Sequence, residues 1–436
     1  MSAVPESFFV STGVKSGAGG YKSLLTISGL LFLLCVVALI YALATNPEEL
    51  PWPYIVVNYT YFLGLTQFGV AFVAIMRICN ARWARPFYRV AEALTLSFFP
   101  IAILGFLCIY FFGRDVLFDY WLNPKEGEHI SGWLNSPFLL WRNVIALLLF
   151  YAVAVVYVLA GLIPDMTEEN ASEGPKWRQA IYKNLLSRKS KKSEEQMRWH
   201  KRNVYFYSSY VILACALALT FISWDLGMTL VSHYHSTVFP MYFMMGCMFA
   251  GSALIFLMFR LVVGFSEVDR FFDTHYQGKS VGILLTGFAL LWLYFFWAQF
   301  FVSWYGNLPY EYGVISKQMY GHYAPMFWLQ ILCLIGIPIG SLIFAKVKRT
   351  IWPMILLSLF ICAGVWLNRY LIVMPAYYDD HQLLGSIAEF VASIGFLSGF
   401  LFLFLWTVNA FPMASTWELE DASKGPDADS PRFGFD

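Results

Sequence analysis

Ten long apolar segments constrain the fold of this chain more than any other feature. They cover residues 22–45, 53–77, 89–112, 136–162, 203–226, 237–260, 280–304, 323–345, 351–374 and 384–412. Each is at least as long as the roughly 20 residues that a helix needs to cross a hydrocarbon core of about 30 Å. Only 13% of the residues are charged, whereas a soluble domain averages about 25%. The sequence therefore predicts an all-α integral membrane protein with about ten transmembrane helices.

The distribution of Lys and Arg predicts the orientation of these helices. If the amino terminus is cytoplasmic, 24 of the 29 Lys and Arg residues fall in segments on the cytoplasmic side. The positive-inside rule then places both termini in the cytoplasm. The first 20 residues lack a basic region followed by an apolar one, so we expect no cleaved signal peptide.

A possible internal repeat predicts how the helices are grouped. The second helix has Gly64 and Gly69, and the sixth has Gly246 and Gly251 at the same spacing, although the neighbouring Tyr-Phe pairs are displaced by one residue. A true repeat would give two like-oriented four-helix bundles, helices 2–5 and 6–9, with flanking helices 1 and 10.

The predicted parts of the chain follow from this grouping. They are a cytoplasmic arm (1–21), the first transmembrane helix and an outer loop (22–52), the first bundle (53–226) with a basic cytoplasmic loop (163–202), the second bundle (227–374), the last transmembrane helix (375–412) and a cytoplasmic tail (413–436). The tail is polar and contains Pro, Gly and Asp, so we expect it to be disordered unless a partner holds it.

A stretch from Phe221 to Tyr242 predicts a site at the outer boundary of the membrane. Asp225 ends one apolar run, and His233 and His235 come before the next. Groups that bind and release protons are costly at a membrane boundary and usually have a function. We therefore expect Asp225 to lie within reach of a histidine or an arginine.

Other polar residues in or beside the spans are candidates for a proton path. They are Glu92 and Asp165 near the inner side, Gln67, Tyr294 and Gln299 deeper, and Arg369 and Glu389 near the outer side. Glu92, which follows Arg85 and Arg89, fits either a surface ion pair or the mouth of such a path. Gln67 fits interhelical hydrogen bonding or contact with a ligand. Arg142 lies close enough to the outer boundary to snorkel.

Cysteine and histidine usage argues against a metal or haem site within the chain. Almost all of the seven Cys lie inside predicted helices, and none forms a CxxC pair. No His lies at the middle of a predicted span, where a bis-histidine haem would need its ligands. Any electron carriers are therefore expected in partner subunits. The basic run at 176–202 predicts a helix on the anionic inner leaflet rather than a nucleic-acid site.

Four segments give the chain a family resemblance. They are AEALTLSFFP in the third helix, SWDLGMTLVSHYHSTVFPMYF from Ser223, QFFVSWYGNLPYE from Gln299 and WLNRYLIVMP from Trp366. With them, the chain from about Trp52 to Pro412 resembles the NrfD/PsrC-like integral membrane subunits. Within these it is most similar to the ActF subunits of alternative complex III, a quinol:electron acceptor oxidoreductase.

The resemblance implies a bundle subunit without a bound redox cofactor, in the bacterial inner (cytoplasmic) membrane. It implies an iron-sulfur protein subunit, a second NrfD-like quinol-binding subunit and haem c subunits as partners. Quinol-binding members carry a His in the second helix where this chain reads Leu65-Thr66-Gln67. Gln67 can hydrogen-bond a quinone oxygen but cannot accept a proton near neutral pH, which disfavours a quinol site here.

Three functions remain open from the sequence. The first is a subunit of a quinol-oxidising complex of a respiratory or photosynthetic chain that supplies a scaffold and a proton path. The second is direct binding and oxidation of quinol, with Asp225, His235 and Asn307 as candidate quinone contacts. The third is a stand-alone secondary transporter, although Pro100 and Pro338 do not occupy matching helix positions, as broken transporter helices usually do.

Overall fold

The structure confirms the predicted helical membrane protein. It is a computed structural model that describes residues 19–45, 51–124, 131–172, 176–231, 234–266 and 272–423. In this part of the chain there are ten helices that are long and apolar enough to cross a membrane, and there is no β-strand. Each span corresponds to one of the ten apolar segments.

The spans are α1 (Gly19–Thr45), α2 (Trp52–Ile78), α3 (Tyr88–Leu117), α5 (Ser136–Leu162), α8 (Glu194–Asp225), α9 (Phe239–Val263), α10 (Lys279–Gly306), α12 with α13 (Ala324–Ile331 and Ile337–Leu342), α15 (Ile351–Tyr377) and α16 (Ile387–Ala410). Shorter helices are α4 (Asp119–Leu122), α6 (Glu168–Ser172), α7 (Lys176–Ser190), α11 (Pro309–Met319), α14 (Ala345–Lys348) and α17 (Thr416–Ser423). The 3-10 helices are η3 (Arg82–Phe87), η4 (Ile163–Asp165), η5 (Met228–Leu230) and η8 (Gly321–Tyr323), and the π-helices are η7 (Thr274–Gly278) and η9 (Leu332–Gly336).

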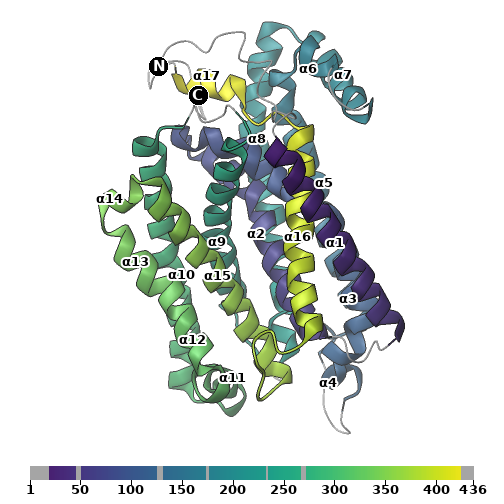
Figure 1. Ribbon diagram of the computed structural model, residues 1–436, viewed down its shortest axis with the longest axis vertical. Helices are drawn as coiled ribbons and strands as arrows, with labels where there is room; N and C mark the ends of the chain where they lie inside the picture. Colours follow the sequence, from purple (N-terminus) through teal and green to yellow (C-terminus); the bar gives the residue numbers. More distant parts are fainter. Residues whose placement is uncertain are drawn as a thin grey trace.

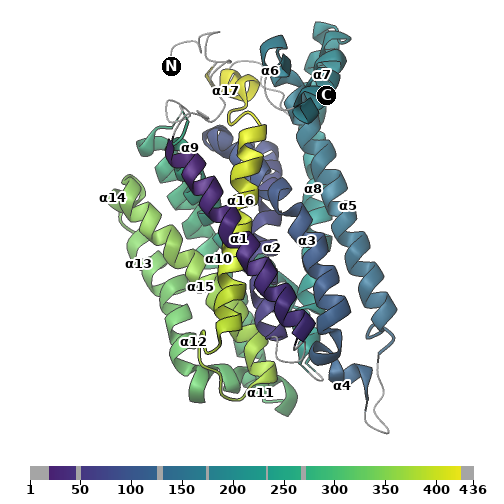
Figure 2. The ribbon, with the colours of Figure 1, turned by 45° about the vertical axis from the view of Figure 1, so that its right-hand side comes forward.

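The molecule has two polar ends with the spans between them. Helices α6, α7 and α17 lie at one end, which we call the terminal face, and α4 and α11 lie at the other, the opposite face (Figure 1). Helix α1 starts at the terminal face and α16 returns to it (Figure 2). This arrangement is what an even number of spans requires.

Helix contacts divide the spans into two groups and a flanking pair. In the first helix group, α2, α3, α5 and α8 pack around one another; in the second, α9 packs on α10 and α15, α12 packs on α15, and α13 packs on α10. Helices α1 and α16 pack on each other at the side of the bundle (Figure 2). Helix α2 also packs on α9 and α15. Because α2 contacts both helix groups, the contacts alone do not establish two separate four-helix bundles, and that division stays a prediction.

Close approach of α2 and α9 joins the two helix groups. A Cβ atom on Gly64 would overlap Sγ of Cys247, and one on Gly251 would lie 2.7 Å from Cδ1 of Phe68. Only Gly lets the two backbones come so near. The glycines that suggested a repeat therefore include residues that form the seam between the groups.

The expectation of a disordered tail is wrong for its first part. Residues 416–423 form helix α17, and the Glu418 side chain is fully buried at the terminal face. A buried carboxylate needs charged or hydrogen-bonding partners, and that of Glu418 finds them in two nitrogens of Arg77. Residues 424–436 lie outside the described part of the chain.

Candidate functional site

A buried charge cluster lies at the terminal face of the first helix group. Its members, which we call the terminal network, are Arg77, Arg89, Glu92, Asp165 and Glu418. Arg77 comes from the last turn of α2, Arg89 and Glu92 from the start of α3, Asp165 from η4 and Glu418 from α17. Segments more than 300 residues apart in the sequence therefore meet in one site.

The terminal network alternates acidic and basic side chains. Arg77 faces Glu418 with two nitrogens, Nε at 2.8 Å from Oε1 and Nη2 at 3.1 Å from Oε2, and its Nη2 lies 3.2 Å from Oε1 of Glu92. Arg89 Nη1 donates to Oε2 of Glu92 at 2.7 Å, and Arg89 Nη2 donates to Asp165. Charge-assisted pairs of this kind are the strong hydrogen bonds of a dry interior.

Helix α17 also completes the hydrogen bonding of Asp165. Thr416 Oγ1 donates to Oδ1 of Asp165 at 2.6 Å, and the backbone N–H of Trp417 donates to the same oxygen at 3.1 Å. Arg85 donates to the backbone carbonyl of Glu418. The carboxyl-terminal segment is therefore part of the site rather than an appendage.

Electrostatics keep Glu418 ionised despite its burial. Burial by itself would raise the pKa of this carboxyl, but the charges of Arg77 and Arg89 and the hydrogen bonds it accepts outweigh that effect and lower the pKa. The surface ion pair considered for Glu92 is wrong, because Glu92 and both of its arginine partners are buried.

A second buried ion pair lies at the opposite face of the same helix group. Asp225, at the end of α8, accepts from Nε of Arg142 at 2.6 Å and from a second guanidinium nitrogen, and it also accepts from Asn143. The guanidinium lies over the Trp133 ring, 4.2 Å from its centroid. The expected partner of Asp225 is thus confirmed as an arginine. Snorkelling of Arg142 is wrong, because the residue is 7% exposed and its guanidinium is bound by Asp225 and by the carbonyl of Trp133.

Two polar side chains lie between these charge clusters without hydrogen-bond partners. Both side-chain atoms of Gln67 and the hydroxyl of Tyr151 are buried and unpaired, and the two side chains lie within interaction range of each other. Gln67 precedes Arg77 by ten residues and Tyr151 follows Arg142 by nine, which corresponds to about 13–15 Å along each helix. Gln67 and Tyr151 are therefore at the middle depth of the first helix group.

His235, the one of the two candidate histidines that the structure describes, is not a hydrogen-bond partner of Asp225. His233 lies outside the described residues, and His235 is exposed at a cavity of about 400 Å³. The same cavity is lined by Ser236, Gln299 and Glu311 among others, but not by Asp225. Ser236 donates to Oε1 of Gln299 at 2.7 Å, and Gln299 donates to Tyr234.

The remaining sequence candidates are scattered over the second helix group. Arg369 is buried and donates to the carbonyl of Phe243 at 2.8 Å and to Oδ1 of Asn368 at 3.1 Å. Tyr294 is 62% exposed on α10, and Asn307 caps that helix with a left-handed backbone, φ 45°. The structure does not bring these three residues into one site.

Glu389 belongs to a separate cluster at the opposite face. Its Oε1 lies 2.7 Å from Nε2 of His381, and Nδ1 of His381 lies 2.7 Å from the hydroxyl of Tyr370. Sequence reasoning missed His381, and it also missed Arg77 and Glu418 in the terminal network. For Arg77 a signal existed, namely an arginine inside the last turn of an apolar span.

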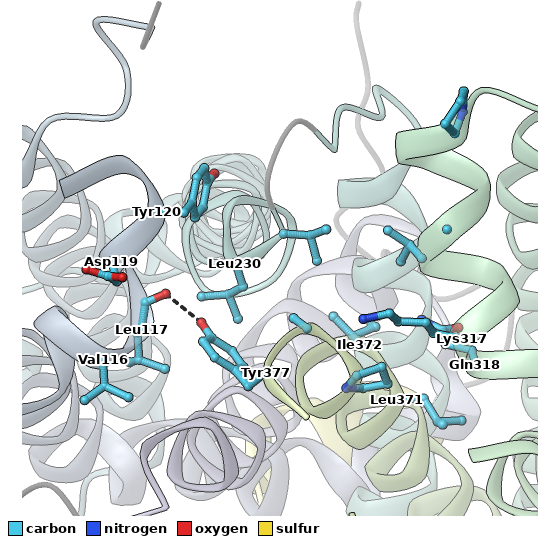
Figure 3. A pocket seen from close by; sticks show the side chains of 16 residues that line it. Val116, Leu117, Asp119, Tyr120, Leu230, Lys317, Gln318, Leu371, Ile372 and Tyr377 are labelled. Carbon is cyan, nitrogen blue, oxygen red and sulfur yellow. Dashed lines mark hydrogen bonds between the residues drawn. The ribbon is translucent and has the colours of Figure 1, made fainter. Parts of the chain in front are cut away.

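A larger cavity, of about 550 Å³, opens on the opposite face between the helix groups. Asp119 and Tyr120 of α4 lie on one side of it and Lys317 and Gln318 of α11 on the other, with Leu230 between them (Figure 3). Tyr377 donates to the carbonyl of Leu117 at 2.7 Å at its edge. None of the candidate residues of the sequence lines this cavity.

The site consists of buried charged and polar side chains. In the described part of the chain no three His, Cys, Asp or Glu side chains lie together as metal ligands would. Four carboxylates, three guanidinium groups and unpaired polar atoms are instead arranged along one helix group.

Comparison with known proteins agrees with the resemblance seen in the sequence. The profile of the family described as "Polysulphide reductase, NrfD" matches residues 42–379. No protein of curated description matches the chain. Because the match covers most of the chain and all spans from α2 to α15, this protein belongs to the NrfD family of integral membrane subunits.

Proposed function

We propose that this chain is the membrane subunit of a quinol-oxidising electron-transfer complex of the alternative complex III type, where it serves as a bundle scaffold and conducts protons. The complex would belong to a respiratory or photosynthetic chain in a bacterial inner membrane, with the terminal face in the cytoplasm. Redox cofactors would reside in partners, namely an iron-sulfur subunit, haem c subunits and a second NrfD-like subunit that binds quinol. Membership of the NrfD family supports this assignment.

The observation that carries the proton path is the placement of buried acids at both ends of one helix group. Glu92, Asp165 and Glu418 lie at the terminal face, and Asp225 lies at the opposite face. Buried charges in membrane helices are costly and tend to mark ion pathways. The first helix group therefore offers proton-binding groups at each membrane boundary.

The middle of the path depends on Gln67 and Tyr151. An internal water needs two to four polar partners, and the unpaired atoms of these two side chains supply three. Gaps of about 13–15 Å separate these two side chains from either charge cluster, and this distance is longer than a single hydrogen bond. Proton conduction therefore requires a chain of waters through this point. Gln67 would hold such a chain but would not itself take up a proton.

The test is proton translocation by the intact complex in sealed vesicles. Gln67→Leu should leave quinol oxidation with an uncoupler unchanged and should lower the number of protons moved per quinol. Thr66→Val is the matched control, because the Thr66 hydroxyl donates to carbonyls of its own helix, those of Phe62 and Leu63. An unchanged proton ratio in Gln67→Leu would reject the path through the first helix group.

Purification from native membranes in mild detergent tests the broader assignment. Co-purifying chains with haem c and iron-sulfur spectra are expected. A colourless chain without partners would instead reject the electron-transfer role and favour a secondary transporter.

A second candidate function is quinol binding by this subunit, favoured by the cavity beside His235. The cavity of about 400 Å³ combines an imidazole, Ser236 and Gln299 with apolar side chains such as Val302, as a quinone head group would need. In that case His235→Ala should raise KM for quinol or abolish oxidation, and a photoreactive quinone should label α10. Normal quinol kinetics in His235→Ala would exclude this function.

A further inference from the structure

Helix α7 is fixed at the level where the spans end. Its Tyr182 hydroxyl donates to the carbonyl of Ala410, the last residue of α16, at 2.9 Å. Its Lys189 Nζ donates to the carbonyls of Pro164 and Met166 at 2.8 and 2.7 Å. These bonds tie α7 to the ends of α16 and of the α5–η4 segment, so it lies where lipid head groups begin.

One side of α7 continues the lipid-facing surface of the spans. Trp177 and Ile181 are 42% and 40% exposed, and because they are four residues apart they lie on the same side of the helix. The Trp177 ring stacks on that of Trp406, with centroids 5.5 Å apart. Trp406 is itself half exposed on the last turns of α16. Tryptophan favours this interfacial depth, so α7 contacts the same lipids as α16.

Positive charge accompanies this apolar edge. Residues 176–202 contain ten Lys and Arg and only two Glu. Arg188, which is exposed, lies three turns beyond Trp177 on the same side of α7. Burial first and the charge of Arg188 second lower the pKa of Lys192, so these two cations lie near enough to repel each other. An anion between them would relieve the repulsion.

We propose that α7 and the turn to α8 form a binding surface for anionic phospholipid head groups of the leaflet at the terminal face. Trp177 and Ile181 enter the boundary between head groups and acyl chains, and Arg188 and Lys192 take the phosphate charge. The surface is coupled to the terminal network, because Lys189 holds the two carbonyls that flank Asp165. Lipid bound to α7 therefore steadies η4.

The experiment is hydrogen-deuterium exchange of the whole protein in nanodiscs of phosphatidylcholine, with or without phosphatidylglycerol. Residues 176–190 should exchange more slowly in the anionic bilayer, by roughly fivefold per cation engaged. The Arg188→Gln, Lys192→Gln double variant should lose this protection. The Lys346→Gln, Arg349→Gln variant, which removes two exposed cations of the same face near α14, should retain it.

Three results would overturn the proposal. One is equal exchange of α7 in both bilayers, and another is full protection in the Arg188→Gln, Lys192→Gln variant. The third is protection by inorganic phosphate in neutral nanodiscs, because the surface would then bind a free anion rather than a lipid. If a Trp177→Ala variant keeps the slower hydrogen exchange in the anionic bilayer, the proposed insertion of Trp177 among the lipids is wrong.

Discussion

The two helix groups hold buried charge in different ways. In the first group Arg77, Arg89 and Arg142 each meet a carboxylate, as Arg77 meets Glu418 and Arg142 meets Asp225. In the second group Arg369 is equally buried, yet within the described residues no carboxylate oxygen lies near enough to form an ion pair with it. Neutral acceptors and the face of the Phe243 ring, 3.5 Å from the guanidinium carbon, surround Arg369 instead.

This difference concerns which buried arginines have a titratable acid beside them. Arginine partners favour the ionised form of a carboxylate, whereas a guanidinium among neutral groups has no nearby acid to titrate. The two helix groups therefore differ in whether a titratable acid accompanies the buried guanidinium. The predictions below test this contrast.

The largest effect is expected from Asp225→Asn. The change leaves the buried Arg142 without its counter-charge and should lower the free energy of unfolding by about 3–5 kcal/mol. Thermal unfolding in detergent measures the loss. The control is Asp115→Asn, which breaks an exposed pair with Arg114 and should cost at most about 0.5 kcal/mol.

A double variant sharpens the same prediction. Replacing both partners, with Arg142→Met and Asp225→Leu, should recover much of the stability because no unpaired charge remains. If Asp225→Asn is as stable as the control, the contrast between the helix groups is lost.

Glu418→Gln should weaken the terminal network by about 2–3 kcal/mol, because it removes one acceptor and the negative charge and leaves Glu92, which also pairs with Arg89, as the carboxylate partner of Arg77. The pH dependence has a defined sign. Since the folded pKa of Glu418 lies below the ordinary 4.5, its stabilisation is complete above that value and is lost as pH falls through the folded pKa.

Hydrogen exchange of α17 measures this effect. In the wild type, protection of residues 416–419 should stay constant down to about pH 4.5 and then fall. In Glu418→Gln this fall should be much reduced. The same acid dependence in both proteins would show that another group controls the docking of α17.

Gly64→Ala tests the seam that joins the two groups. The added methyl overlaps Sγ of Cys247 and should cost about 2 kcal/mol through overpacking. Gly287→Ala on α10 is the matched control, because nothing lies within 4 Å of its added Cβ. Equal melting temperatures of the two variants would mean that α2 and α9 can separate freely.

The smallest effect is expected from Arg369→Met, about 1 kcal/mol. The carbonyl of Phe243 still accepts a bond within α9, and no acid is left unpaired. A loss as large as that of Asp225→Asn would reveal an anionic partner of Arg369 and contradict the contrast. Thermal unfolding of both variants in one detergent decides the question.

Much of the fold follows from the sequence, but little of the site does. Apolar length predicts ten spans because a bilayer requires each backbone segment to satisfy its own hydrogen bonds. The sequence predicts only that the partner of Asp225 is a histidine or an arginine. It does not identify Arg142, because that residue lies 83 positions away and no local pattern links the two. Of the two interpretations of Glu92, the surface ion pair is wrong because its partners Arg77 and Arg89 are themselves buried and bound by Glu418 and Asp165, which come from distant parts of the chain.

The sequence by itself determined the number and length of the spans and the candidate acids and histidines, because hydrophobicity and charge act locally. The tertiary structure decided which charges pair. It placed Glu418 of a polar tail against Arg77, left His235 at a cavity away from Asp225, and left Arg369 among neutral groups. These outcomes depend on which helix faces meet. The energy of an ion pair in a dry interior changes strongly over a few ångströms, and no local sequence pattern specifies the distances between helices to that accuracy.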